Sequence, residues 1–106
     1  MCIRADIKVE VFIPEKDKQK VIDGLNKKEI LKDNGYDSVF SQTPVLGHFI
    51  PLEGSNPNIG EIAKLESVEE VKLEFRIKAA DKEEAYKIIK ENHPYEVPII
   101  NFFSLI

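Results

Sequence analysis

Two segments in which apolar and polar residues alternate constrain the fold of this chain more than any other feature. In residues 7–13 a β-branched residue occupies every second position, and in residues 71–77 four apolar residues alternate with lysine, glutamate and arginine. A period of two predicts strands that are buried on one face only. Each segment is followed by a charged stretch with apolar residues at helical spacing, which predicts helices over residues 15–30 and 81–92.

Turn-forming residues divide the middle of the chain. After Asn34-Gly35, residues 36–43 predict a strand, and Pro44–Gly47 a turn. His48–Ile50 then predicts a short extended piece, and residues 51–60 predict a loop that contains two prolines and two glycines.

The end of the chain predicts a capped helix and a final strand. Asp81 and Glu84 have the spacing of a capping box, with Asp81 at the N-cap. His93-Pro94 should end this helix, and residues 97–105 predict the last strand. The order strand-helix-strand-strand-helix-strand predicts an α+β, ferredoxin-like βαββαβ fold, an antiparallel sheet with two helices on one face. With 106 residues the chain is expected to form a single domain, 1–106.

The uncovered face of this sheet and its final strand differ in charge. On the two central strands the uncovered face would carry lysines, an arginine and glutamates, which can pair between neighbouring strands. The final stretch, VPIINFFSLI, has seven apolar residues in ten and no charge. At a sheet edge such a strand invites pairing with another chain. The sequence therefore predicts a homo-oligomer.

Composition excludes several classes of function. The net charge is −4, the wrong sign for a general nucleic-acid binder, and no apolar run is long enough to span a membrane. The only cysteine, Cys2, can form no internal disulfide, and the N-terminus does not have the pattern of a signal peptide. A cytoplasmic location is expected, with no nucleic-acid or membrane partner.

Residues that could carry chemistry are few. His48 and His93 lie 45 positions apart without metal-ligand spacing, and they are the weak candidates for a metal site. In a functional interpretation they meet Glu53 and Glu96 around a metal ion or ligand. In the simpler interpretation, which we favour, His93 ends a helix and His48 lies in an ordinary strand.

Two further motifs have a structural and a functional interpretation. Residues 54–60 have glycines at both ends but lack the GK[ST] ending of a phosphate-binding loop, so a structured turn is favoured. Residues 93–96, HPYE, could act as an acid/base trio, but a helix stop that leads into an edge strand is favoured. The chain has no GxSxG motif, and no catalytic residue is assigned.

Three strings together resemble the domain inserted in bacterial YqfO-type proteins, a dinuclear-metal family related to NGG-interacting factor and often labelled as type-II GTP cyclohydrolases. They are GHFIPLEGSNPNIGE (47–61), KLESVEEV (64–71) and HPYEVP (93–98). The matching positions are Pro51, Leu52, Glu53, Gly54, Asn56, Pro57, Ile59, Gly60, Glu61, Lys64, Leu65, Glu66, His93, Pro94, Tyr95, Glu96 and Pro98.

The resemblance implies a PII/CutA-like ferredoxin fold, and PII and CutA proteins assemble as trimers. It does not imply the metal centre of the full-length family, whose ligands belong to flanking domains. The chain departs from the family pattern near the loop: Ile50 replaces arginine, Val39 cysteine, Asn58 an aromatic residue and Val97 an acid. If the family loop binds an anion through that arginine, this ability should be lost or changed.

Together these observations predict a non-catalytic, regulatory homotrimer that binds a small ligand or a divalent metal ion at subunit interfaces. The first alternative is a protein-interaction module that docks on a larger enzyme. The second is a metal-dependent enzyme that uses His93 and Glu96. The residues expected to bind the ligand are His48, Glu53, Asn56, Glu61, His93, Tyr95 and Glu96.

Overall fold

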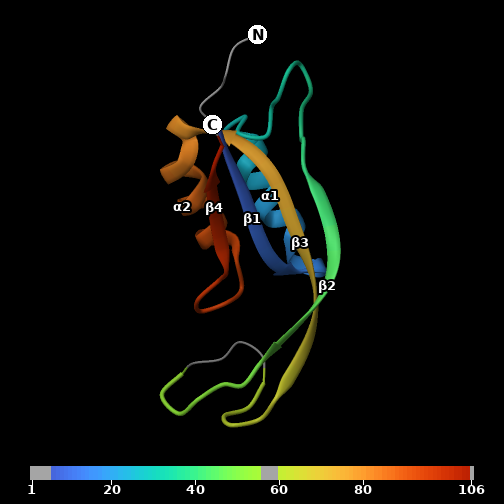
Figure 1. The fold of residues 1–106 in the computed structure, drawn as a ribbon, viewed down its shortest axis with the longest axis vertical. Coiled ribbons are helices and arrows are strands. Elements are labelled where there is room, and N and C mark those ends of the chain that lie inside the picture. The colour runs from blue at the N-terminus through green and yellow to red at the C-terminus, as the bar shows by residue number, and fades with distance from the viewer. Residues whose placement is uncertain (1–5, 56–59, 106) are drawn as a thin grey trace.

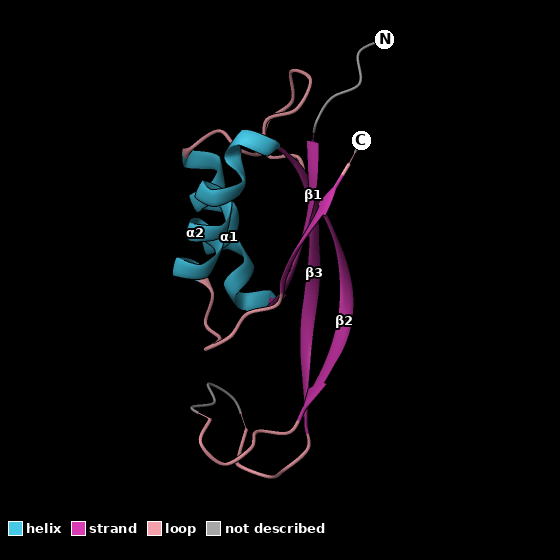
Figure 2. Cartoon of the chain, turned by 60° about the vertical axis from the view of Figure 1, so that its left-hand side comes forward, coloured by secondary structure: helices cyan, strands magenta, loops and turns pink. Residues whose placement is uncertain are grey.

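A computed structural model describes residues 6–55 and 60–105, and it forms the expected α+β, ferredoxin-like fold. The sheet is antiparallel with strand order β2-β3-β1-β4 (Figure 1), and both helices lie on the same side of it (Figure 2). The elements are β1 (Asp6–Pro14), η1 (Glu15–Asp17), α1 (Lys18–Lys27), β2 (Ser41–Phe49), β3 (Glu66–Lys78), η2 (Ala79–Asp81), α2 (Lys82–Asn92) and β4 (Ile100–Ser104).

The alternating residues of β1 and β3 form the floor of the core. Val9 lies opposite Phe75 and Val11 opposite Leu73, and all four side chains are buried under the helices. Helix α1 covers them with Val21, Ile22 and Leu25, and α2 with Ala85, Ile88 and Ile89. Gly24 is where α1 meets α2, because a Cβ at this position would lie 2.8 Å from Ile88 Cγ2. The absence of a side chain at Gly24 therefore permits close packing of the two helices, at a cost in helix propensity.

The predicted bounds of the second strand and the turn predicted at Pro44–Gly47 were wrong. The structure has a continuous strand, β2, through the predicted turn at Pro44–Gly47, and no strand over residues 36–40. Proline has no N–H group to donate to a neighbouring strand. Because β2 is an edge strand with a neighbour on one side only, it tolerates Pro44. Positive φ angles at Asn34 and Gly35 form the predicted turn. A further positive φ at Ser38 lies within the expected strand, and such an angle does not occur in a regular strand.

The predicted capping box was also wrong. Asp81 is at the N-cap of α2 but makes no side-chain cap hydrogen bond. Its φ of −93° and ψ of 0° continue the short helix η2, whereas a capping side chain needs extended backbone. Glu84 instead points to Lys28, 3.9 Å away. The helix predicted over residues 15–30 ends earlier, at Lys27, and the strand predicted over residues 97–105 begins later, at Ile100.

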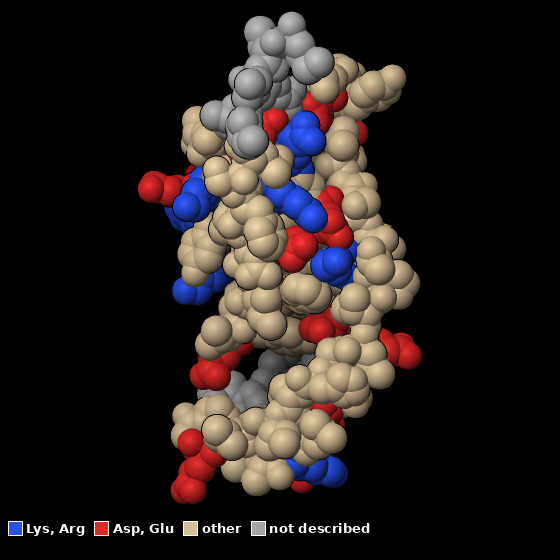
Figure 3. All heavy atoms as spheres, in the orientation of Figure 1, with Lys and Arg blue, Asp and Glu red and all other residues tan. Residues whose placement is uncertain are grey.

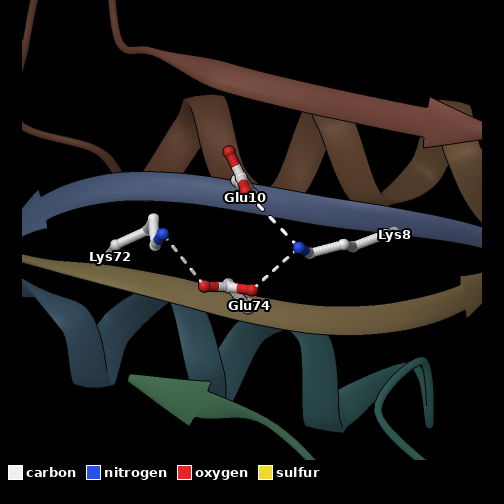
Figure 4. Close-up of polar contacts among 4 residues, drawn as sticks. All are labelled: Lys8, Glu10, Lys72 and Glu74. Carbon is white, nitrogen blue, oxygen red and sulfur yellow. Dashed lines mark ion pairs between the residues drawn. The ribbon is translucent and has the colours of Figure 1, made fainter. Parts of the chain in front are cut away.

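The helix-free face of the sheet carries the predicted ion pairs (Figure 4). Glu10 lies directly opposite Glu74, and Lys8 lies between them, 3.5 Å from Glu10 and 2.9 Å from Glu74. Lys72 is 3.2 Å from the other oxygen of Glu74. The hydrogen bond from Lys8 and that from Lys72 lower the pKa of Glu74, and Glu74 raises the pKa of Lys8. Lys8 thus offsets the repulsion between two facing carboxylates.

Strands β2 and β3 continue beyond the rest of the sheet. β1 pairs with Glu70–Lys78 of β3, whereas β2 pairs with Glu66–Glu74. The segments 46–49 and 66–69, with the described loop residues 50–55 and 60–65, therefore project as what we call the arm (Figure 1). The arm contributes to the 52 Å length of a molecule whose other dimensions are 24 and 22 Å. No described helix is both long and apolar enough to cross a membrane.

The ion pairs generate a first prediction. In Lys8→Met the facing carboxylates of Glu10 and Glu74 lose their shared cation, so unfolding by urea should occur at a lower concentration than in the wild type. The difference should shrink in 1 M salt, which screens charges on the surface. The control is Arg76→Met, because Arg76 lies opposite Lys8 but makes no ion pair within the described residues. Equal stability of K8M and R76M in low salt would contradict the role of Lys8.

Candidate functional site

A cavity of about 520 Å³ lies between the arm and the connection from α2 to β4. The space-filling view shows the molecule hollowed between the arm and the rest of the chain (Figure 3). The cavity is lined by Phe12, Val45, Leu46, Gly47, His48, Phe49, Pro51, Ser55, Glu70, Tyr95, Glu96, Val97 and Ile99. Its size is within the usual range for small-molecule sites, about 300–1,000 Å³, and most of its lining is apolar.

His93 fixes the start of the α2–β4 connection. Its Nδ1 accepts a hydrogen bond from the backbone N–H of Tyr95 at 3.2 Å, so Nδ1 carries no proton. Its Nε2 lies 2.7 Å from the carbonyl oxygen of Phe12, which can only accept, so Nε2 carries the proton and donates it. Burial lowers the pKa of His93, against the opposing effect of the Phe12 carbonyl. The ring is therefore neutral, and both of its nitrogens are engaged.

Tyr95 joins this connection to β3 across the wall of the cavity. Its hydroxyl donates a hydrogen bond of 2.6 Å to Glu70 Oε2. Burial and the carboxylate of Glu70 raise the pKa of Tyr95 far above its usual range, so the hydroxyl keeps its proton. Gly47 of β2 makes room for this pair, because a Cβ at position 47 would collide with Glu70 Oε1. Glycine at position 47 thus serves close approach and does not form a turn.

His48 lies on the arm, in register with Ser67 on β3. Its Nδ1 and the Ser67 hydroxyl oxygen are 2.9 Å apart. This hydrogen bond holds the imidazole against the strand pair at the edge of the cavity.

The structure brings only some of the expected ligand-binding residues together. His48, Tyr95 and Glu96 line the cavity. Glu53 and Glu61 are exposed on the loop and do not line it, and Asn56 lies outside the described residues. His93 is buried behind the wall.

Sequence reasoning did not single out Glu70, Phe12 or Gly47 as site residues. Glu70 lies in β3, directly before the alternating residues 71–77, and has the charge expected at an outward-facing position. Its contact with Tyr95 therefore has no sequence signal. The outward-facing positions of β1 carry Lys8 and Glu10, and Phe12 is apolar where a third charged residue would be expected. This exception is a sequence signal that could have drawn attention to Phe12.

The described residues do not form a metal site. They contain no group of three or more histidine, cysteine, aspartate or glutamate side chains arranged to hold a metal ion. His93 uses both of its nitrogens within the fold, so it has no free ligand atom. The donor set that zinc or a similar ion requires is thus missing from the part of the chain that the structure describes.

Comparison with known proteins shows where similar chains occur. No family model matches the sequence. Proteins named GTP cyclohydrolase 1 type 2 homolog are 37% identical over 98 residues in Staphylococcus aureus and 36% identical in Staphylococcus epidermidis. Each alignment covers 92% of this chain, which spans only 27% of the length of these relatives.

Solved structures show two kinds of neighbour. One is a Bacillus cereus protein related to NIF3, with a TM-score of 0.82 and 27% identity, which matches 99% of this chain with 27% of its own length. The other is CutA1 from Pyrococcus horikoshii, with a TM-score of 0.68 and 25% identity, of which this chain covers 82%. CutA1 from Oryza sativa, at 13% identity and a TM-score of 0.70, shares the fold. The chain thus resembles both a part of longer NIF3-related proteins and nearly the whole of CutA1.

The neutral, buried His93 generates a second prediction. Its pKa is lower in the folded than in the unfolded chain, where it has its ordinary value of about 6.5. The unfolded chain then binds more protons, so folding stability should be full above pH 6.5 and fall as the pH drops toward the folded pKa. Urea unfolding between pH 7.5 and 5 should show this slope, and His93→Gln should reduce it. His48→Gln, which replaces the exposed histidine, is the control.

A direct measurement is available in the wild type. ¹⁵N chemical shifts of the His93 ring should report a proton on Nε2 and titration below pH 6.5. Titration at or above that pH would show that burial does not control this residue.

The contact between Tyr95 and Glu70 generates a third prediction. Tyr95→Phe removes the hydrogen bond to a carboxylate and should lower the free energy of unfolding by about 1 kcal/mol. Tyr86→Phe is the control, because Tyr86 lies on the exposed side of α2 and packs on Phe102 with its ring. Denaturant titration of both variants would test this, and an equal effect in the two would mean that the tie to Glu70 contributes nothing.

Proposed function

We propose that this chain is a non-catalytic, regulatory domain that assembles as a homotrimer and binds a small ligand in the cavity beside the arm. We further propose that it acts as one domain, residues 1–106, in the cytoplasm. The observation that carries the proposal is the exposed apolar surface of the arm next to a ligand-sized cavity.

The exposed apolar surface supports self-association. Among the described residues from 46 to 65, six large apolar side chains are exposed: Leu46, Phe49, Ile50, Leu52, Ile62 and Leu65. Val97 and Ile99 extend this surface on the far wall of the cavity. An apolar surface of this extent usually marks a site of protein interaction.

The outer edge of β4 also supports assembly. Its inner edge pairs with β1, and no described strand pairs with the other. Unpaired backbone groups along such an edge are available to a strand of another copy. A copy that covers the arm or this edge would help to close the cavity.

The geometry favours an organic ligand over a metal ion. The cavity walls are mainly apolar, and the described residues contain no cluster of metal-binding side chains. The alternative of an enzyme that uses His93 and Glu96 has less support, because His93 is engaged through both ring nitrogens.

A second candidate function is docking on another protein. The relatives named GTP cyclohydrolase 1 type 2 homolog are much longer, and this chain matches 27% of their length. A domain of this kind therefore occurs joined to other protein surface, and the apolar arm is the surface that could make such a contact.

The assembly proposal generates a fourth prediction. Light scattering after gel filtration at micromolar concentration should give a mass of about 36 kDa, three times the 12.1 kDa of one chain. Replacing Leu52 and Leu65 on the arm by serine should yield the 12.1 kDa monomer, because burial of apolar surface drives association.

The control for this experiment is Tyr36→Ser. Tyr36 is 73% exposed, close to the 70% of Leu52, but it lies in the turn after α1, outside the arm. Y36S should therefore remain oligomeric. A wild-type monomer of 12.1 kDa would overturn the proposed self-assembly and leave docking on another protein as the better explanation of the arm.

A further inference from the structure

The residues that line the cavity carry charge of one sign. Among the described lining residues, Glu70 and Glu96 are carboxylates, His48 is an imidazole, and none is lysine or arginine. The other walls are formed mainly by aromatic and aliphatic side chains of Phe12, Val45, Leu46, Phe49, Pro51, Val97 and Ile99. A ligand that enters this space would meet an apolar surface and negative charge.

Glu70 is held in place before any ligand arrives. Its Oε2 accepts the Tyr95 hydroxyl at 2.6 Å, and its Oε1 lies over Gly47. A carboxylate has about four acceptor positions, so the bond from Tyr95 leaves acceptor capacity for a donor on a ligand. Because Glu70 is partly buried among apolar lining residues, the attraction between its carboxylate and a cation is stronger than it would be in open solvent.

The same features disfavour anions. A phosphate or carboxylate ligand would face the like charges of Glu70 and Glu96 without a lysine or arginine among the described lining residues. Moving such a ligand out of water would therefore not be compensated by an opposite charge.

From this complementarity we infer that the cavity selects an organic cation, an amine carried on an aromatic or aliphatic body. The ammonium group donates to Glu70 and the body packs between Phe12, Phe49 and Ile99. The inference rests on the proposed function, since it assigns a chemical class to the ligand of that cavity.

Three probes of matched size test the inference: 2-phenylethylammonium, 3-phenylpropionate and the uncharged 2-phenylethanol. Each is titrated at pH 7.5 into the full ¹⁵N-labelled chain, and amide shifts of residues 45–49 and 95–99 report binding. The cation is expected to bind about tenfold more tightly than the anion, with the alcohol between them. In Glu70→Gln the preference for the cation over the anion should fall severalfold.

The variants are matched to separate charge from folding. The amide introduced by E70Q retains an oxygen that can accept from Tyr95, so this substitution removes the charge and preserves the tie. Glu69→Gln removes the same charge from the neighbouring residue of β3, which does not line the cavity, and should keep the wild-type preference.

The outcomes separate the inference from the proposed function. Equal binding of all three probes, tighter binding of the anion, or an unchanged preference in E70Q would overturn cation selection and leave a ligand site in the cavity. Absence of shifts at residues 45–49 and 95–99 with every probe would overturn both the inference and ligand binding in this cavity.

Discussion

Strand β3 has 13 residues and extends beyond β1, the nine-residue strand beside it at the centre of the sheet, and the arm and the cavity both depend on this extension. Val71–Ile77 of β3 packs against β1 and the helices, whereas Glu66–Glu69 pairs with β2 alone. The first part supplies the hydrophobic stabilisation, and the second projects from it as the arm. Because one continuous strand belongs to both, the arm is held at a defined position relative to the core, and a cavity can form beside it.

The opposite wall of the cavity is positioned by polar contacts. The helix stop at His93-Pro94 turns the chain, and His93 attaches it to the backbone of Phe12. Two residues later, the Tyr95 hydroxyl donates a hydrogen bond to Glu70 on β3. Gly47 on the neighbouring strand β2 leaves room for the Glu70 side chain. Burial keeps His93 neutral and Tyr95 protonated, so each acts as a fixed hydrogen-bond donor. The residues that resembled an acid/base trio thus position one wall of the cavity.

The comparisons place this architecture in two contexts. Similar chains form about a quarter of longer proteins related to NIF3, and the same fold forms most of CutA1. Here the core is made by the alternating strands and two helices, and the arm carries exposed apolar side chains.

The amino-acid sequence by itself determined the fold class, the two central strands and the charge pairs of the uncovered face, because alternation and helical spacing are local and each position reports its own burial. It predicted β2 poorly, because whether Pro44 interrupts a strand depends on whether that strand lies at an edge. It also suggested His48, Tyr95 and Glu96, which line the cavity. Only the tertiary structure decided that Glu70 meets Tyr95 across 25 positions and that His93 binds the carbonyl of Phe12 across 81. Such contacts depend on the relative placement of elements distant in sequence, which no local pattern encodes.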